Sequence, residues 1–148
     1  MEKILKIEER RFEVKNGSFT KVVLPYYEGE LYSSDTYHGF IIHTNIQDIV
    51  FGISDYQSCC EDAGYLTTND NIDDFVGAEL KKIILVDKDL NHKAVKEIEE
   101  SIDEGNMMFA NIYTSNGVLQ LVAYNRHNGY YSHDAVIVSK QLNYNTSL

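Results

Sequence analysis

Three Asn-Gly dipeptides, each close to runs of β-branched and aromatic residues, constrain the fold of this chain more than any other feature. They stand at Asn16-Gly17, Asn116-Gly117 and Asn128-Gly129. Both residue types tolerate the positive φ angles of a two-residue β-turn, so the dipeptide is typical of tight hairpins. The sequence therefore predicts a protein with several antiparallel hairpins.

Strand-forming residues dominate the first third of the chain. Arg11 to Lys15 and Phe19 to Leu24 flank the first Asn-Gly pair, and Phe40 to His43 and Ile49 to Ile53 are two further apolar runs. Each has the length and composition of a β-strand. Between them, Tyr26 to Gly39 contains four tyrosines without a clear period, which predicts an ordered loop or an irregular edge segment. Its tyrosines can line a contact surface or serve as ordinary packing residues.

Two short elements are expected in the middle of the chain. Asn71 to Gly77 starts with a capping Asn, continues with acidic residues and ends with Gly, which predicts one or two helical turns. Leu80 to Val86 has the composition of a strand.

One segment, from about Asn91 to Glu104, has the pattern of a long amphipathic helix. Val95, Ile98 and Ile102 recur at helical spacing and predict the buried face. The outer face is strongly acidic, and its candidate partner-binding residues are Glu97, Glu100 and Glu104.

The last part of the chain has the pattern of a meander. Met107 to Thr114, Val118 to Tyr124 and Tyr131 to Val138 predict three strands joined at the second and third Asn-Gly pairs, and Gln141 to Leu148 has the composition of a tail. The predicted fold class is α+β, an antiparallel sheet of hairpins and a C-terminal meander with one long helix packed on a face. No repeat or linker divides the sequence, so we expect a single domain over residues 1–148.

Composition indicates an acidic protein of the cytoplasm. The chain is 43% hydrophobic, which suffices for one core, and it contains neither a signal peptide nor a long apolar run. Its formal net charge is −10, from 23 Asp and Glu residues against 13 Lys and Arg residues. Affinity for nucleic-acid phosphates is therefore not expected, whereas a protein partner with a basic surface is. Solubility alone would also explain this charge.

Cys59 and Cys60 are the main candidates for a metal site or a reactive thiol. They are adjacent, and the chain has no other cysteine. Two thiolates and two imidazoles can close a tetrahedral Zn²⁺ site, and four protein ligands are typical of structural zinc. The imidazoles nearest to the third Asn-Gly pair belong to His127 and His133. The predicted metal site therefore consists of Cys59, Cys60, His127 and His133.

This metal site depends on the turn between its two histidines. A two-residue turn at Asn128-Gly129 would place His127 and His133 on opposite faces of a hairpin, and a three-residue loop would place them on the same face. His43 could replace either histidine, and Asp55 could serve as an oxygen donor.

Two other interpretations of the cysteine pair are open. The cysteines can be small buried hydrophobes, or one can be a nucleophile with a histidine as its base. Asp55, Glu61 and Asp62 disfavour a thiolate nearby, and the sequence has no Gly-rich phosphate loop or metalloprotease motif. We therefore predict no catalytic residue.

Three sequence blocks carry a resemblance to a known family. They are Gln57-Ser58-Cys59-Cys60-Glu61, Asn71 to Gly77, and Asn128-Gly129-Tyr130-Tyr131-Ser132. In this order, over about residues 40 to 138, they resemble a domain family of unknown function in phage and prophage proteins. The resemblance implies a phage origin, and small acidic phage proteins without catalytic motifs are similar in size and charge to anti-CRISPR inhibitors.

The expected function is a phage-encoded, non-enzymatic inhibitor that binds a basic, nucleic-acid-handling surface of a host defence nuclease. The acidic helix face would make the contact in the host cytoplasm, and structural Zn²⁺ would hold the fold rigid. Two alternatives are a sponge for a small nucleotide, which would use tyrosines and Arg126, and a cysteine-dependent enzyme.

Overall fold

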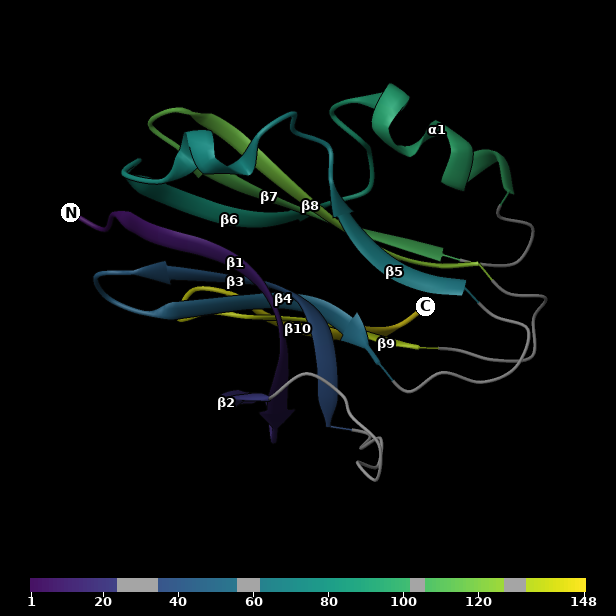
Figure 1. Cartoon of the computed structure of the whole chain (residues 1–148), viewed down its shortest axis with the longest axis horizontal. Coiled ribbons are helices and arrows are strands. Elements are labelled where there is room, and N and C mark those ends of the chain that lie inside the picture. The colour runs from purple at the N-terminus through teal and green to yellow at the C-terminus, as the bar shows by residue number, and fades with distance from the viewer. Residues whose placement is uncertain (24–34, 56–61, 102–105, 127–132) are drawn as a thin grey trace.

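The protein is a sandwich of two antiparallel β-sheets (Figure 1). The computed structural model describes residues 1–23, 35–55, 62–101, 106–126 and 133–148. Six strands form one sheet in the order β10-β9-β4-β3-β1-β2, and four form the other in the order β5-β8-β7-β6. The elements are β1 (Ile4–Lys15), β2 (Ser18–Val23), β3 (Thr36–Thr44), β4 (Asp48–Ser54), β5 (Asp62–Thr67), the 3₁₀ helix η1 (Ile72–Phe75), β6 (Leu80–Val86), α1 (His92–Ser101), β7 (Asn106–Thr114), β8 (Gly117–Arg126), β9 (Asp134–Val138) and β10 (Asn143–Ser147).

The main core lies between the two sheets. Alternate residues of each strand face inward, among them Ile49, Phe51 and Ile53 of β4 and Leu119 and Leu121 of β8, none more than 1% exposed. Each sheet therefore buries the apolar face of the other, as in other sandwiches.

The predicted α+β class is wrong, because the sheets cover each other's inner faces and the helix is a minor element. Helix α1 covers part of the outer face of the four-stranded sheet, and the end of the predicted helix after Ser101 lies outside the described residues. Its Val95 is fully buried against Phe109 and Val122, as the helical pattern predicts. The side chains of Ile98 and Ile102 lie outside the described part of the chain. No helix in that part is both long and apolar enough to span a bilayer.

Only the first hairpin of the predicted C-terminal meander is present. Strands β7 and β8 pair around Asn116-Gly117, but β9 pairs with β4 in the other sheet. There its inward-facing Ala135 and Ile137 complete the core, which explains why β9 leaves β8. The tail expected over Gln141 to Leu148 is wrong as well, because β10 pairs with β9 and the Leu148 side chain is buried.

Several local predictions are confirmed. Asn16 and Gly17 have φ angles of 53° and 76° at the turn between β1 and β2. Asn71 caps η1 by accepting a hydrogen bond from the Asp73 amide, and Gly77 follows with a φ of 89°. Strand β6 has the predicted bounds, whereas β5 has no counterpart in the prediction.

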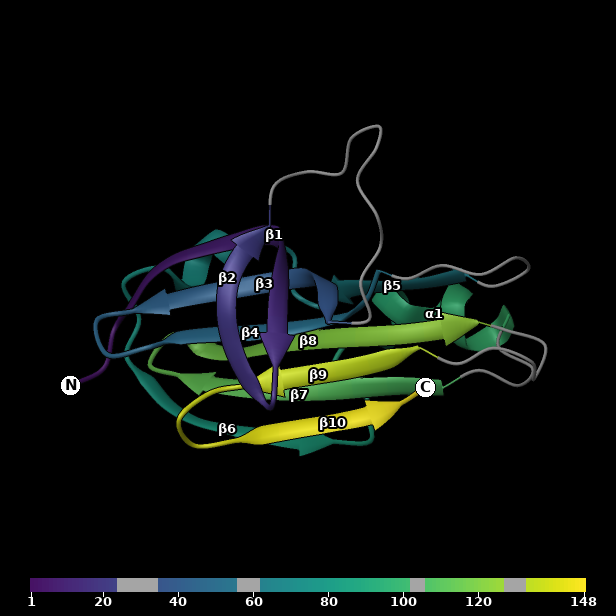
Figure 2. The ribbon, with the colours of Figure 1, turned by 90° about the horizontal axis from the view of Figure 1, so that it is seen from below.

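The β1–β2 hairpin folds over the outer face of the six-stranded sheet, where β2 runs steeply across β3 and β4 (Figure 2). A register shift between Glu13 and Val14 interrupts the pairing of β1 with β2. A second apolar cluster forms beneath the hairpin and includes Phe12, Val14, Tyr37, Ile41, Val50 and Val136. The hairpin therefore stands out from the sheet beside β9 and β10.

Leu121→Ala tests the role of the packing between the sheets. We expect it to lower the free energy of unfolding by about 3 kcal/mol, because it removes buried methyl groups and leaves a cavity. Leu5→Ala is the matched control, since Leu5 is 57% exposed, and it should cost less than about 0.5 kcal/mol. Urea unfolding measures both, and equal losses would contradict the assigned core.

Candidate functional site

Most residues that the sequence nominates for function lie outside the described part of the chain. The zinc site and the acidic helix face therefore stay predictions. The residues concerned are Cys59, Cys60, His127, Glu104 and the side chains of Glu97 and Glu100.

His133, the fourth predicted zinc ligand, lies in a buried polar cluster at the end of β4. Its imidazole Nδ1 is 3.1 Å from the carbonyl oxygen of Ser54, the residue before Asp55. The structure therefore brings His133 next to Asp55, the predicted substitute oxygen donor, which stands four positions before Cys59 in the sequence.

Arg11 neutralises Asp55 inside this cluster. The Arg11 Nε donates to Asp55 Oδ2 at 2.7 Å, and both side chains are largely buried. Such a pair is costly to break, because removal of one partner leaves a buried charge. The other carboxylate oxygen, Asp55 Oδ1, is buried and has no hydrogen-bond partner.

His38 is the fourth member of the buried polar cluster, which consists of Arg11, His38, Asp55 and His133. Burial lowers the pKa of His38, and the neighbouring His133 and Arg11 lower it further, against an opposing effect of Asp55. The imidazole lies 5.3 Å from the ring of Tyr65, measured between centroids, and its buried Nε2 has no hydrogen-bond partner. His38 is therefore neutral at physiological pH.

Tyr65 of β5 packs against His38 of this cluster. Burial raises the pKa of Tyr65 to about 12, and the charge and hydrogen bond of Glu9 act in the same direction. The phenol therefore stays protonated. Among the described residues, no group of three His, Cys, Asp or Glu side chains is arranged to hold a metal ion, so His38, Asp55 and His133 alone are not a metal centre.

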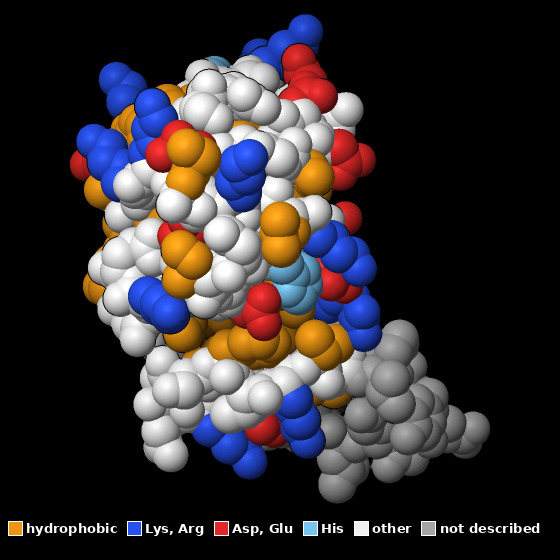
Figure 3. Space-filling view, turned by 90° about the vertical axis from the view of Figure 1, so that its left-hand side faces the viewer, with side chains coloured by type: hydrophobic (Ala, Val, Ile, Leu, Met, Phe, Trp, Pro, Cys, Tyr) orange, Lys and Arg blue, Asp and Glu red, His pale blue; other side chains and the backbone are white. Residues whose placement is uncertain are grey.

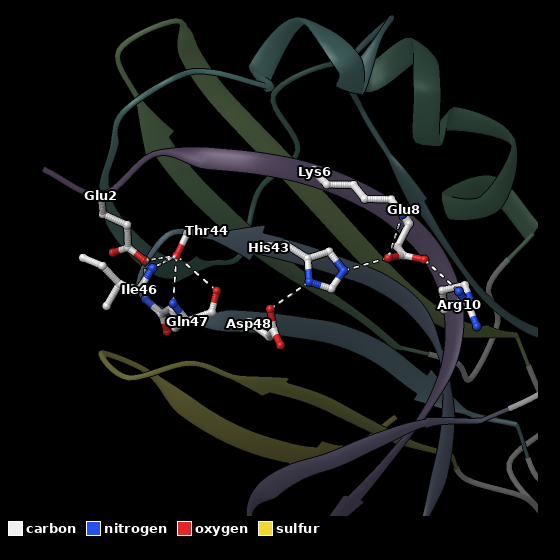
Figure 4. A network of polar contacts seen from close by, with 9 residues as sticks. All are labelled: Glu2, Lys6, Glu8, Arg10, His43, Thr44, Ile46, Gln47 and Asp48. Atoms are coloured by element: carbon white, nitrogen blue, oxygen red, sulfur yellow. Dashed lines mark hydrogen bonds and ion pairs between the residues drawn. The ribbon is translucent and has the colours of Figure 1, made fainter.

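His43, the predicted substitute zinc ligand, belongs to a different polar network on the outer face of the sheet (Figure 4). Its Nε2 is 2.7 Å from Glu8 Oε2, and its Nδ1 is 2.7 Å from Asp48 Oδ1. The hydrogen bond with His43 lowers the pKa of Glu8. Lys6 and Arg10 also form ion pairs with the Glu8 carboxylate, so basic side chains offset its negative charge. Both ring nitrogens of His43 therefore lie against carboxylates of this network rather than beside the other predicted zinc ligands of the described residues.

Surface charge is mixed on the face shown in Figure 3, where basic and acidic side chains lie among one another. A groove between the β1–β2 hairpin and strands β9 and β10 differs from this pattern. Its volume is about 450 Å³. Among the described residues that line it, two are carboxylates and none is Lys, Arg or His. Its polar and aromatic residues, which define the acidic groove, are Asn16, Asp35, Tyr37, Asp134, Asn143, Tyr144 and Asn145.

The pKa of Tyr37 is affected by the carboxylates of the acidic groove. Burial raises the pKa of Tyr37, the charges of Asp134 and Asp35 raise it further, and a hydrogen bond with Asn145 acts in the opposite direction. Both carboxylates therefore act on the Tyr37 hydroxyl. Tyr37 belongs to the tyrosine-rich segment that the sequence nominates as a contact surface, but nothing in the sequence places Asp134 beside it.

Sequence analysis missed Arg11 and His38 because their partners are distant along the chain. Arg11 and Asp55 are 44 residues apart. One signal was available: His38 has the same parity as Phe40 and Ile42 in β3, so the alternation directs its imidazole inward.

The expectation of membership in a family of unknown function is confirmed. A family model described as Domain of unknown function (DUF7448) matches residues 2–137, a longer stretch than the sequence blocks indicate. No curated protein and no solved structure matches the chain.

Arg11→Met tests the buried ion pair. We expect it to lower the free energy of unfolding by about 3 kcal/mol or more, because Asp55 would keep its buried charge without the Arg11 guanidinium. Arg10→Met is the matched control on the same strand, where the exposed ion pair with Glu8 should contribute less than about 1 kcal/mol. Urea unfolding at neutral pH distinguishes them, and equal effects would count against a buried pair.

His38→Gln tests the neutral imidazole. The pKa of His38 in the folded protein is below its ordinary value of 6.5, so the unfolded chain binds more protons. The resulting stability is present above pH 6.5 and is lost as the pH falls toward the folded-state pKa. Between about pH 7.5 and about pH 5.5 the wild type should lose more free energy of unfolding than His38→Gln. Parallel losses in urea unfolding would refute this role.

Proposed function

Because the chain belongs to the DUF7448 family, whose function is unknown, we propose its function from its own geometry: it is a non-enzymatic protein that binds a basic surface of another protein through the acidic groove. The observation that carries this proposal is a concave site with two carboxylates and no basic side chain among its described lining residues. Complementary charge steers such a site toward cationic partners and excludes anionic ones.

The charge balance of the rest of the described surface supports the choice of this groove. Around His43, the carboxylates of Glu8 and Asp48 are paired with an imidazole and with basic side chains. Asp134 forms no ion pair with another described residue and is exposed at the edge of the groove. Its charge is thus available to a partner, whereas the charges around His43 are used within the protein.

The proposed partner is a nuclease of a host defence system, and the chain would act as a phage inhibitor of the anti-CRISPR type. Support comes from the net charge of −10, which suits a channel that normally holds nucleic acid, and from the sequence blocks. The acidic face of α1 and a structural Zn²⁺ held by the cysteine pair are further parts of this proposal. Nucleic acid should then compete with the protein for the nuclease.

The groove favours this function over a nucleotide sponge. A bound nucleotide would place its phosphates beside Asp35 and Asp134, which repel them. Arg126, the cation nominated for that role, does not line the groove; its guanidinium lies 5.7 Å from the ring centroid of Tyr124. The cysteines that an enzyme would use lie outside the described part of the chain.

Salt and a charge-neutralising variant test the proposal on a purified candidate nuclease. We expect Asp134→Asn to raise the Kd about tenfold, and NaCl from about 0.05 to about 0.5 M to weaken binding of the wild type more than that of the variant. Asp70→Asn is the control, because Asp70 is an exposed carboxylate that does not line the groove. Isothermal titration calorimetry measures each Kd, and a wild-type Kd independent of salt would refute an electrostatic contact.

A further inference from the structure

The backbone edge of strand β10 is the feature that the proposed function leaves unused. This strand forms the lower margin of the six-stranded sheet in Figure 2. We propose that this edge pairs with the same edge of a second copy of the chain, so that two six-stranded sheets become one continuous sheet across a two-fold axis. The inference goes beyond the proposed function, because the partner is another copy of the same protein.

The pairing of β10 with β9 identifies the backbone groups that would make this contact. The His133 amide donates to the Leu148 carbonyl at 3.1 Å, and the Leu148 amide donates to the His133 carbonyl at 2.8 Å. Such hydrogen-bonded pairs recur at every second position of an antiparallel ladder. Tyr144 and Thr146 therefore direct their amides and carbonyls toward β9. The backbone groups that point away from β9 belong to the alternate residues, which are Asn143, Asn145 and Ser147.

The outer edge of β10 is exposed and uncharged. Asn143, Asn145 and Ser147 are exposed, and no described strand pairs with β10 on the side opposite β9. Unpaired edges of natural sheets usually carry charged residues, which discourage pairing with another chain. The charged residues of the other edge strands include Lys21 of β2, Asp62 of β5, and Lys81 and Lys82 of β6. By contrast, β10 contains neither a charged residue nor a proline, so its edge lacks this protection.

The sequence of β10 is complementary to itself in an antiparallel register centred on Asn145. In that register Asn145 faces its own copy across the axis, and Asn143 faces Ser147 of the second copy. All residues whose backbone groups point outward are then matched with one another, and each pair can exchange two backbone hydrogen bonds. A shift of two residues in either direction would leave one of these residues in each chain unpaired. The centred register is therefore favoured.

Tyr144 adds a side-chain contact in this register. It pairs with Ile137, whose side chain lies in the main core, so the Tyr144 ring is on the inner side of the sheet, where it is 44% exposed. Across the axis it lies opposite Thr146 of the second copy, at the spacing where cross-strand side chains contact each other. Thr146 lines an open groove of about 410 Å³ whose apolar residues include Leu85, Val86 and Met107. The Tyr144 ring of the second copy would cover part of this apolar surface.

Symmetry favours a second copy over an unrelated peptide, because the two-fold pairing uses the uncharged edge and the Tyr144 contact twice. The contact is nevertheless small, since β10 is only five residues long. Small interfaces are typical of weak and transient association. We therefore expect a dimer with a Kd between about 0.1 and about 1 mM.

Sedimentation equilibrium and NMR measurements of amide exchange on the full chain test this dimer. About 0.3 M NaCl screens the repulsion between two chains of net charge −10. From about 0.02 to about 2 mM protein, the average mass should rise above that of the monomer, and exchange of the Asn145 and Ser147 amides should slow at least about twofold. The amides of Tyr144 and Thr146 should change less, because they already bond to β9.

Two results would overturn the proposal. A chain that stays monomeric over the whole range would leave the edge of β10 to an extended peptide of a different protein. A dimer that leaves the Asn145 and Ser147 amides unprotected would form through another surface.

Two substitutions at Asn145 test the register. Asn145→Lys places like charges directly opposite each other across the axis and should raise the Kd of the dimer at least about tenfold. Asn145→Gln keeps a neutral amide and is the matched control, with a Kd expected within about twofold of the wild type. The backbone amide spectrum confirms that each variant is folded. Equal Kd values for the two variants would overturn the two-fold pairing at Asn145.

Discussion

The mutual burial of two apolar sheet faces is the interaction on which this structure depends. Strand β1 joins the two layers at one end, because the Ile4 amide donates to the Ala78 carbonyl at 2.9 Å and the Ile4 carbonyl accepts from Gly77 at 2.7 Å. From there β1 continues along β3 in the six-stranded sheet. With the inner faces fixed in this way, the outer faces can carry other structures: α1 on one sheet, and the β1–β2 hairpin on the other.

The backbones of β3 and β4 approach each other closely beneath the β1–β2 hairpin. Gly39 and Gly52 face each other across these strands. A Cβ at Gly39 would lie 2.0 Å from the Phe51 carbonyl oxygen, and a Cβ at Gly52 would lie 2.3 Å from that of His38 and 2.9 Å from the Phe12 ring. The space above this pair is thus filled by Phe12, which is fully buried. Beyond Phe12, β1 leads into the Asn16-Gly17 turn, which forms part of the acidic groove.

The sequence predicted the features that depend on neighbouring residues. It did not predict the features that depend on pairing between distant strands. Positive φ angles at Asn16-Gly17 and the cap at Asn71 depend on neighbouring residues, and both could be predicted. The pairing of β9 could not, since β8 precedes it in the chain and its apolar pattern fits either sheet. The helical spacing around Val95 correctly predicted its burial. The helical pattern does not show, however, that a second sheet rather than a helix covers the main core. The candidate site divides in the same way, because His133 and Asp55 could be named individually while their contacts with Arg11 and His38 depend on the fold.

Three groups of charged residues in the described part of the chain differ in their environments. In the buried polar cluster, Arg11 neutralises Asp55 and His38 is neutral, so burial carries little net charge. Around His43, imidazole and basic side chains surround the carboxylates at the surface. In the acidic groove, the carboxylates raise the pKa of Tyr37 and no cation from the described lining opposes them. Holding like charges together in a concave site lowers stability, because each raises the cost of the other. A partner that brings positive charge would remove this cost, and for that reason the proposed function assigns the contact with a basic partner to the groove.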